Sequence, residues 1–314
     1  MTYKSNPEID VLLATYNGEK FLLEFLESLV KQSEVRINLI VGDDGSTDKT
    51  LSIIESFIGR FSSLVIYRNT RLGPLSNFRF LLSKSQALLI AFADQDDVWN
   101  SNHLRDSVIR VQQFNSNNPT LSVCSTLSFG EKIKDSAIFP KCFLPDFRKN
   151  LYFFENAFRG CTMVINDKLR EVLLKSNWHD AVMHDWWIFL TALYSGKVNY
   201  VLEPEVNYRI HSANVIGEPT LNDKVKKVWK IAVDKDWAPL RQAIGFLDDP
   251  IQSMSEIERL NLNNLTAALI GRSNIISAFR VVLNSRFRAS ILQNMALKLL
   301  LLIRVTKFRL IRDT

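Results

Sequence analysis

The 314-residue sequence has few of the residues that mark flexible or cross-linked proteins. Glycine (11) and proline (9) are scarce, so long flexible linkers are not expected. The three cysteines, Cys124, Cys142 and Cys161, form no Cys-x-x-Cys pair, which argues against a disulfide framework or a structural zinc site and favours a reducing compartment. The N-terminus has no apolar run behind a basic start, so no signal peptide is expected.

Several catalytic motifs are also missing. The sequence has no P-loop, no dinucleotide-binding glycine fingerprint, no Gly-x-Ser-x-Gly elbow and no His-Glu-x-x-His motif, so those chemistries have no support. Hydrophobic residues make up 46% and charged residues 23%, which is the balance of a soluble globular protein. The net charge of +6 lies in the tail, because residues 286–314 hold seven basic residues and one acid. The remaining chain is neutral, which argues against a nucleic-acid groove.

Four short apolar segments typical of buried strands alternate with amphipathic helices over the first hundred residues. These segments are residues 9–16, 37–41, 64–67 and 87–93. The alternation predicts an α/β fold with an open, mostly parallel sheet wrapped by helices. Beyond about residue 115 the pattern loosens, with one further strand expected at 121–126. From residue 221 onward only helices are expected, over 224–233, 257–269, 275–283 and 288–310.

Acidic residues follow two of the predicted strands, at Asp43-Asp44 and at Asp94-Gln95-Asp96-Asp97. Open α/β sheets bind ligands beyond the carboxyl ends of their strands. The carboxylates of residues 94–97 repel one another, and a divalent cation such as magnesium or manganese would remove that repulsion. The alternative is a helix start, with Asp96 or Asp97 capping a helix over 99–111. The two uses can coexist.

Three motifs together resemble family 2 glycosyltransferases in order and spacing: Thr15-Tyr16-Asn17-Gly18, Val41-Gly42-Asp43-Asp44-Gly45-Ser46-Thr47-Asp48 and Phe92-Ala93-Asp94-Gln95-Asp96-Asp97-Val98-Trp99. Within that family, the Asp-Gln-Asp-Asp-x-Trp form most resembles bacterial rhamnosyltransferases. The resemblance covers roughly residues 7–218 and implies a GT-A fold that takes a nucleotide-diphosphate sugar. It implies a catalytic domain over 1–218, with a nucleotide-sugar half at about 1–115 and an acceptor half at about 116–218. A helical C-terminal region with a basic amphipathic tail would then occupy 219–314.

The resemblance also implies roles for the first two motifs. Asp43 matches the position that accepts a hydrogen bond from the imide N–H of uracil or thymine, and Thr15 and Asn17 would line the base and ribose pocket. Asp44 is expected to hold the turn. Arg71 could face the donor, although an exposed arginine in a turn is the simpler interpretation.

Asp94 and Asp96 match the family's Asp-x-Asp metal motif, with Asp96 expected to contact Mn²⁺ or Mg²⁺ directly. The segment Tyr208-Arg209-Ile210-His211-Ser212-Ala213-Asn214-Val215-Ile216-Gly217 resembles the run near the end of this catalytic domain. His211 would then be a further metal ligand or a diphosphate contact. Gly160, in a segment that resembles the one between donor and acceptor sites, would let the backbone approach the sugar closely.

The cluster His184-Asp185-Trp186-Trp187 places a carboxylate beside two flat apolar rings. The family places its catalytic base at the position of Asp185, which would take a proton from the acceptor hydroxyl. Trp186 and Trp187 could stack on sugar rings, and His184 could position the acceptor. The residues alone equally fit a helix N-terminus that Asp185 caps while the tryptophans fill the core.

The implied reaction is a metal-dependent, inverting transfer of a sugar to a hydroxyl of a growing surface polysaccharide or lipid-linked glycan. Rhamnose from dTDP-rhamnose is favoured by the Asp-Gln-Asp-Asp form, and UDP-linked hexoses stay open. The alternative is a non-catalytic scaffold of the same fold within a glycan-assembly complex, although a scaffold would not need all of the acidic residues and His211.

The apolar stretch Met295–Ile303 is too short and too closely flanked by charge for a transmembrane helix. With basic residues around it, this segment suits an interfacial helix on an anionic membrane, and it could equally be a helix docked on protein. We therefore expect a cytoplasmic protein, peripheral on the inner face of the cytoplasmic membrane. Its expected partners are a nucleotide-diphosphate sugar, a glycan acceptor, the membrane surface and a possible second copy, with no nucleic acid.

Overall fold

The computed structural model describes residues 6–130, 137–141, 151–211, 231–232, 234 and 236–312, which fall into two compact units. The first unit comprises Met1–Lys141, Phe158–Lys175 and Met183–Ser212, and the second comprises Cys142–Ala157, Ser176–Val182 and Ala213–Thr314. Residues 151–157 and 176–182 thus join the second unit although they precede residue 218 in the chain.

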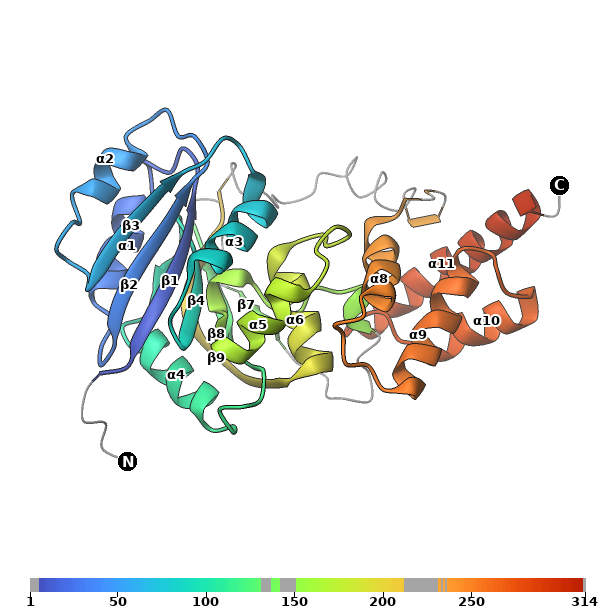
Figure 1. Ribbon diagram of the computed structural model, residues 1–314. Helices are drawn as coiled ribbons and strands as arrows, with labels where there is room; N and C mark the ends of the chain where they lie inside the picture. Colours follow the sequence, from blue (N-terminus) through green and yellow to red (C-terminus); the bar gives the residue numbers. More distant parts are fainter. Residues whose placement is uncertain are drawn as a thin grey trace. The chain divides into compact units, whose positions relative to one another are not determined.

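Four parallel strands form the first half of the sheet in the first unit (Figure 1). They are β1 (Glu8–Thr15), β2 (Arg36–Asp43), β3 (Ser63–Arg68) and β4 (Leu89–Asp94), in the order β3-β2-β1-β4. Every residue from Ile9 to Leu13 is buried, as expected for a parallel strand that is covered on both faces. The strands expected at 9–16, 37–41, 64–67 and 87–93 are confirmed to within a few residues at their ends.

The register of these strands brings their carboxyl ends to one edge of the sheet. Thr15 of β1 lies opposite Asp43 of β2, and Ala14 lies opposite Asp94 of β4. Asp43 in turn lies opposite Arg68 of β3. The polar residues that follow three separate strands therefore meet at the same edge.

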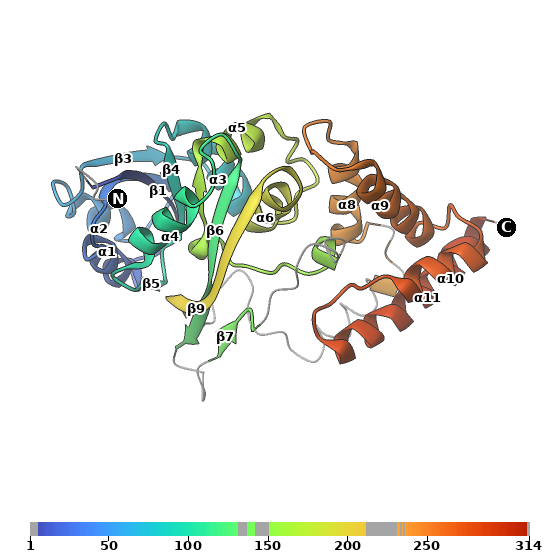
Figure 2. The same ribbon diagram turned by 90° about the horizontal axis from the view of Figure 1, so that it is seen from below.

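The sheet continues beyond β4 through β8 (Val164–Asn166), β6 (Thr120–Phe129), β9 (Lys197–Arg209) and β5 (Val98–Trp99). A short strand, β7 (Ile138–Phe139), pairs with β6. The long strands β6 and β9 run parallel and side by side (Figure 2), whereas β8, β5 and β7 pair antiparallel with their neighbours. The α/β class is confirmed, with a sheet that is parallel in its first half and mixed beyond β4.

The helix expected over 99–111 begins later than predicted. Val98 and Trp99 form β5 by pairing with Asn207 and Val206 of β9, and α4 spans His103–Gln112. Neither Asp96 nor Asp97 caps that helix, so the capping interpretation is wrong. The Asp97 carboxylate accepts a hydrogen bond from the backbone N–H of Arg209 instead, at 3.0 Å.

Helices cover the sheet of the first unit. They are α1 (Leu22–Val30), α2 (Thr50–Glu55), α3 (Gly73–Lys84), α4, α5 (Asp167–Lys175) and α6 (His184–Ser195), with a 3₁₀ turn, η2 (Gly160–Thr162). On α1, the four residues Leu22, Phe25, Leu26 and Leu29 are fully buried, which is the apolar face that their helical spacing predicts. Burial of this face against the sheet holds α1 beside the strand edge.

The second unit is helical among its described residues. It contains α8 (Ala238–Asp248), α9 (Glu256–Leu269), α10 (Ile275–Asn284) and α11 (Ile291–Arg312). The helices expected at 257–269 and 275–283 are confirmed, and the last one begins at Ile291 rather than at residue 288. Most of the helix expected at 224–233 lies outside the described residues, as do Cys142 and Ser212–Gly217. No helix in the described part of the chain is both long enough and apolar enough to cross a bilayer.

Candidate active site

Asp43 lies at the end of β2 and is almost completely buried, at 1% exposure. Its Oδ1 accepts hydrogen bonds from the hydroxyls of Thr15 (2.9 Å) and Ser46 (2.6 Å), and its Oδ2 accepts one from the Ser46 N–H (2.9 Å). A carboxylate offers about four acceptor positions, so one remains for a further donor. The structure therefore joins Asp43 and Thr15 in one network and orients the Asp43 carboxylate before any ligand binds.

Asn17 ties the loop after β1 to the loop after β2. It has a left-handed backbone with φ 46°, which asparagine tolerates better than most residues. Its backbone N–H donates to the Ser46 hydroxyl at 2.9 Å, and its side-chain oxygen accepts from the Thr47 N–H at 2.9 Å. Asn17 thus holds the two loops together at the carboxyl edge of the sheet, and its side-chain oxygen is already hydrogen-bonded to the protein.

Gln95 connects the first loop to the acidic motif after β4. Its side-chain oxygen accepts from the Tyr16 N–H and its amide nitrogen donates to the Tyr16 carbonyl, both at 3.0 Å. A Cβ on Gly18 would come within 2.3 Å of the same side-chain oxygen, so a larger residue there would displace the Gln95 amide. The spacing of the sequence gave no sign of this role for Gln95.

Asp44 holds the turn that precedes α3, as expected. Its two carboxylate oxygens accept from the backbone N–H groups of Leu72 (3.1 Å) and Gly73 (2.7 Å). Arg71, in the same turn, is exposed and has φ 50°. Its guanidinium donates to the Tyr16 hydroxyl at 2.9 Å and lies over the Tyr16 ring. Arg71 is thus placed beside the loop after β1, at the same edge as Asp43.

Asp94 and Asp97 form a close group with Cys161, in which one ligand atom from each residue lies within 4.8 Å of the others. Burial, followed by the carboxylates of Asp97, Asp96 and Asp185, raises the pKa of Asp94 well above its usual value. Burial and the Asp96 carboxylate likewise raise the pKa of Asp97 to about 7. These shifts place Asp96, Asp97 and Asp185 within electrostatic reach of Asp94.

His211 lies next to Asp96, with 2.8 Å between His211 Nε2 and Asp96 Oδ2. Both side chains are 17% exposed, so the pair borders solvent. The His211 ring also packs on Phe21, with 4.7 Å between ring centroids. The structure thus brings together Asp96 and His211, two residues 115 positions apart that the sequence predicts as metal ligands.

Arg209 links the end of β9 to the acidic motif. Its Nε donates to the Asp96 carbonyl at 2.8 Å, and its backbone N–H donates to Asp97. The guanidinium lies between the rings of Phe21 (4.7 Å) and Phe129 (4.4 Å) and also pairs with Glu24. This clamp fixes the position of the strand end that carries His211.

Arg159 is a residue that the sequence analysis missed. It lies over the Tyr208 ring at 3.7 Å and contacts the hydroxyl of Thr126. Its charge lowers the pKa of both Asp94 and Asp97, against the larger raising effect of burial. Its position directly before Gly160 was the one available signal.

Gly160 packs against His184. A Cβ at Gly160 would lie 2.4 Å from His184 Nε2, which is far inside any tolerated contact. The His184 ring stacks on Phe78 with 3.9 Å between centroids, and burial lowers the pKa of His184 to about 3. The imidazole is therefore neutral near pH 7. The close packing of this ring is one reason for a glycine at position 160, and the expected approach of its backbone to a sugar stays a prediction.

Asp185 lies in the first turn of α6, is 4% exposed and accepts a hydrogen bond from the Trp186 N–H at 2.7 Å. Trp187 is fully buried and Trp186 is 7% exposed. Both indoles therefore pack inside the unit, as in the structural alternative, and the expected sugar-stacking surface does not form in this conformation. The carboxylate of Asp185 still lies within electrostatic reach of Asp94.

The donor set at the strand-end edge fits a divalent cation. It offers carboxylate oxygens and the imidazole of His211, which are groups that can bind magnesium or manganese. Asp97 Oδ2 is among the buried side-chain atoms of the described residues that lack a hydrogen-bond partner. The raised pKa values of Asp94 and Asp97 report the repulsion that a cation would relieve. Of the candidate ligands, Asp96 and His211 border solvent, whereas Asp97 is fully buried.

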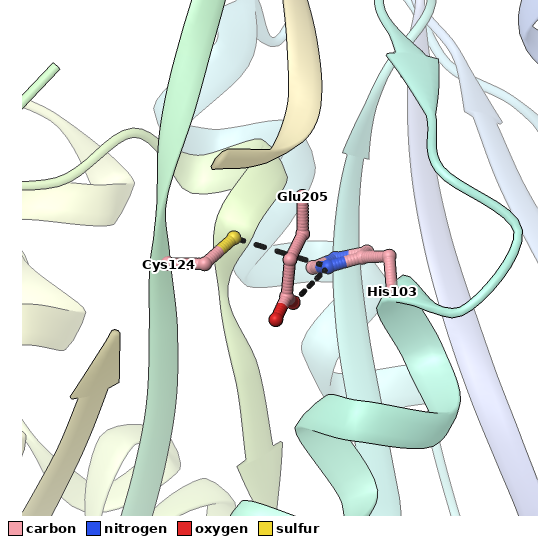
Figure 3. Close-up of side chains that lie close together, drawn as sticks. All are labelled: His103, Cys124 and Glu205. Carbon is pink, nitrogen blue, oxygen red and sulfur yellow. Dashed lines mark hydrogen bonds and ion pairs between the residues drawn. The ribbon is translucent and has the colours of Figure 1, made fainter. Parts of the chain in front are cut away.

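A second cluster, His103, Cys124 and Glu205, brings α4, β6 and β9 together (Figure 3). His103 Nδ1 lies 3.2 Å from Glu205 and 3.9 Å from Cys124 Sγ. Arg110 pairs with both Glu205 oxygens at 2.6 and 2.7 Å, so the carboxylate is already neutralised. Burial also raises the pKa of the Cys124 thiol, which disfavours the thiolate that a metal requires. The cluster is an internal ion-pair network and not a metal centre.

Comparison with known proteins agrees with this arrangement. The family model for "Glycosyl transferase family 2" matches residues 10–162. The dTDP-rhamnosyl transferase RfbG of Shigella flexneri is 30% identical over 222 residues, which cover 65% of this chain and 73% of that protein. TarS of Staphylococcus aureus, a poly(ribitol-phosphate) β-N-acetylglucosaminyltransferase, is 31% identical over 112 residues, which cover 35% of this chain and 20% of TarS.

Solved structures show the same fold at low sequence identity. Residues 1–349 of S. aureus TarS in complex with UDP-GlcNAc align with a TM-score of 0.60 and 14% identity, covering 98% of this chain and 90% of that one. The mannosyltransferase PcManGT of Pyrobaculum calidifontis, in complex with GDP-Man and Mn²⁺, aligns with a TM-score of 0.54 and 14% identity over the same shares. The expected GT-A fold is confirmed.

The GT-A sheet with acidic residues gathered at its carboxyl edge agrees with the family model and with the similarity to a rhamnosyl transferase, which together show a glycosyltransferase. The match to the rhamnosyl transferase and to the family model narrows the class further. The chain belongs to glycosyltransferase family 2.

Proposed function

We propose that this protein is a metal-dependent, inverting rhamnosyltransferase that uses dTDP-rhamnose and extends a surface polysaccharide or a lipid-linked glycan. The observation that carries the proposal is the meeting of Asp43, Asp94, Asp96 and His211 at one strand edge, with Asp185 in electrostatic reach. The choice of rhamnose rests on the Asp-Gln-Asp-Asp motif and on the similarity to RfbG.

Asp43 would bind the nucleobase of the donor. Its carboxylate is held by Thr15 and Ser46 and keeps one acceptor position for the imide N–H of thymine or uracil. Asn17 and Arg71 would line the adjacent base and ribose pocket from the loops after β1 and β3. Because these side chains are already bonded to their neighbours, little ordering is required when the donor binds.

Asp96 and His211 would hold the divalent cation, Mn²⁺ or Mg²⁺, with Asp94 at the diphosphate-sugar end of the same motif. A cation bound there would stabilise the charge of the departing nucleoside diphosphate. Asp185 would accept the proton of the acceptor hydroxyl as its oxygen attacks the anomeric carbon in line. The neutral imidazole of His184 would support Asp185 by packing, together with Trp186 and Trp187.

Donor binding by calorimetry tests the proposal, with dTDP-rhamnose, UDP-glucose and UDP-N-acetylglucosamine compared in the presence and absence of Mn²⁺. Wild type should bind dTDP-rhamnose more tightly than the other donors and only with Mn²⁺ present. Asp96→Asn should lose this Mn²⁺-dependent donor binding. Glu27→Gln, an exposed carboxylate on α1, is the matched control and should bind as wild type does. Metal-independent binding of the donor by both proteins would refute the metal assignment.

The assignment of Asp185 requires turnover with an acceptor. Asp185→Asn should bind the donor with unchanged affinity and lose most of its transfer rate, because the base acts after binding. A variant that binds the donor but transfers at the wild-type rate would remove Asp185 from the mechanism. Donor binding without turnover in wild type would favour the scaffold alternative.

We further propose that residues 1–218 carry catalysis and that residues 219–314 keep the enzyme at the inner face of the cytoplasmic membrane, where a lipid-linked acceptor would lie. The cationic, apolar character of the C-terminal helix supports this location.

A further inference from the structure

The last helix, α11, has an apolar face that no described residue covers. Its inward face, Leu297, Leu301, Val305 and Phe308, is buried in the second unit, with at most 8% exposure. Its outward face carries Leu292, Met295, Leu299 and Ile303, which are 79%, 64%, 62% and 48% exposed. Spacings of three and four residues put these four side chains in line along the helix. We call this line the outer stripe.

The outer stripe differs from ordinary surface composition. Single exposed apolar side chains are common, but a contiguous apolar patch marks an interaction surface. The neighbouring helix α10, which packs on α11, adds Ile276 (73% exposed) and Leu283 (54% exposed), seven residues apart on one face. The second unit therefore exposes apolar side chains on two adjacent helices.

The charge of this region indicates the kind of partner. Residues 271–312 contain no acidic residue and nine basic ones: Arg272, Arg280, Arg286, Arg288, Lys298, Arg304, Lys307, Arg309 and Arg312. Arg304 faces inward and donates to the carbonyls of Leu269 and Ile231. At about 100° of rotation per residue, Lys298 and Lys307 lie at opposite edges of the outer stripe. An apolar line with a lysine at each edge is the pattern of a helix that lies flat in a lipid surface.

We propose that the outer stripe of α11, with the exposed residues of α10, is the surface by which this protein docks on an anionic membrane. Two copies that met through this face would bring two sets of basic residues together, whereas acidic lipid headgroups would complement them. The proposal deepens the location given under the proposed function and rests on it for its purpose, but the binding itself needs no sugar transfer.

Sedimentation with vesicles tests the docking surface, using the full-length protein and phosphatidylcholine vesicles with or without phosphatidylglycerol. Wild type should bind the phosphatidylglycerol vesicles, and added salt should weaken the binding. The double variant Met295→Gln, Leu299→Gln should bind at least about tenfold more weakly, because two apolar side chains no longer insert. Lys307→Gln should lower the affinity for the phosphatidylglycerol vesicles about fivefold and leave binding to the phosphatidylcholine vesicles unchanged.

Ile58→Gln, which alters an equally exposed apolar residue (70%) in the first unit, is the matched control and should bind as wild type does. Thermal unfolding of each variant confirms that it folds, and donor calorimetry separates this test from the proposed function. Absence of wild-type binding to anionic vesicles at low salt would overturn the proposal. A wild-type dimer that the double variant dissolves, measured by light scattering, would assign the outer stripe to a second copy instead.

Discussion

Removal of the Arg209 guanidinium should weaken both the fold of the first unit and its affinity for a divalent cation. Arg209 Nε donates to the Asp96 carbonyl, and the guanidinium lies between the rings of Phe21 and Phe129. The side chain is 13% exposed, so these contacts are largely shielded from water. Arg209→Met keeps the apolar stem and the backbone hydrogen bond to Asp97, and it removes only the charged group.

The loss of stability can be estimated from four contacts. A charged hydrogen bond to a carbonyl contributes about 1.5–3 kcal/mol. Each partly desolvated cation–π contact adds about 0.5–1 kcal/mol. The pair with Glu24 adds little, because the Glu24 side chain is 56% exposed. Since methionine recovers part of the packing, we expect Arg209→Met to lower the free energy of unfolding by about 2–3 kcal/mol.

Urea denaturation measures the stability, and calorimetry with Mn²⁺ measures the second effect. Without the clamp, the Asp96 carbonyl and the strand end that carries His211 are less well positioned, so Mn²⁺ affinity should fall roughly tenfold, equal to about 1.4 kcal/mol. Arg209→Lys should recover less than half of each loss, because an ammonium cannot stack as a planar group.

Arg68→Met supplies the control. Arg68 pairs with Glu55 at the surface, where the two side chains are 68% and 47% exposed, so its removal should cost less than about 1 kcal/mol. An Arg209→Met protein with a free energy of unfolding within about 0.5 kcal/mol of wild type and unchanged Mn²⁺ affinity would refute this role of the guanidinium.

Three further changes probe other contacts. Gly160→Ala should destabilise the first unit by about 1–3 kcal/mol in urea, since its methyl would overlap His184; an unchanged midpoint would contradict that packing. Asp43→Asn should weaken donor binding by at least about tenfold in calorimetry, and it should leave Mn²⁺ binding without donor unchanged. Burial is the largest single influence on the Glu205 carboxylate and raises its pKa, but the hydrogen bonds and charges of His103 and Arg110 together outweigh burial and lower the pKa to about 2. This carboxylate therefore stabilises the fold above its ordinary pKa and loses that effect as pH falls toward 2. Between about pH 5 and pH 3, wild type should therefore lose about 2 kcal/mol more unfolding free energy than Glu205→Gln, and parallel pH curves would rule out this linkage.

The strand-end edge could be predicted from the sequence because the signals are local. Four apolar segments alternate with helices, and parallel strands must end together, so Asp43 and Asp94 had to lie near one another. The family motifs added His211 to this edge, and the structure places it beside Asp96. Each of these inferences depends on short segments whose residue types carry the information.

The failures depend on contacts between distant segments. Val98 and Trp99 have the pattern of a helix start, yet they form a strand because Asn207 and Val206 are available as partners. The choice between a sugar platform and core packing at Trp186 and Trp187 stayed open for a related reason, since a tryptophan near a carboxylate looks the same in sequence whether or not other residues bury it. Burial of this kind is set by packing that periodicity in one segment does not report.

Gln95 shows how one motif can serve two functions. The aspartates beside it offer oxygen ligands, whereas the Gln95 amide both accepts from and donates to the backbone of Tyr16. A glutamate in its place could accept but not donate, and an asparagine would be one methylene too short to span the same gap. Asn17, next to Tyr16, is hydrogen-bonded to Ser46 and Thr47 after Asp43, so the Gln95 amide connects the proposed nucleobase site to the proposed metal site. Donor recognition and metal binding are therefore expected to be coupled in this enzyme even though their side chains lie on different strands.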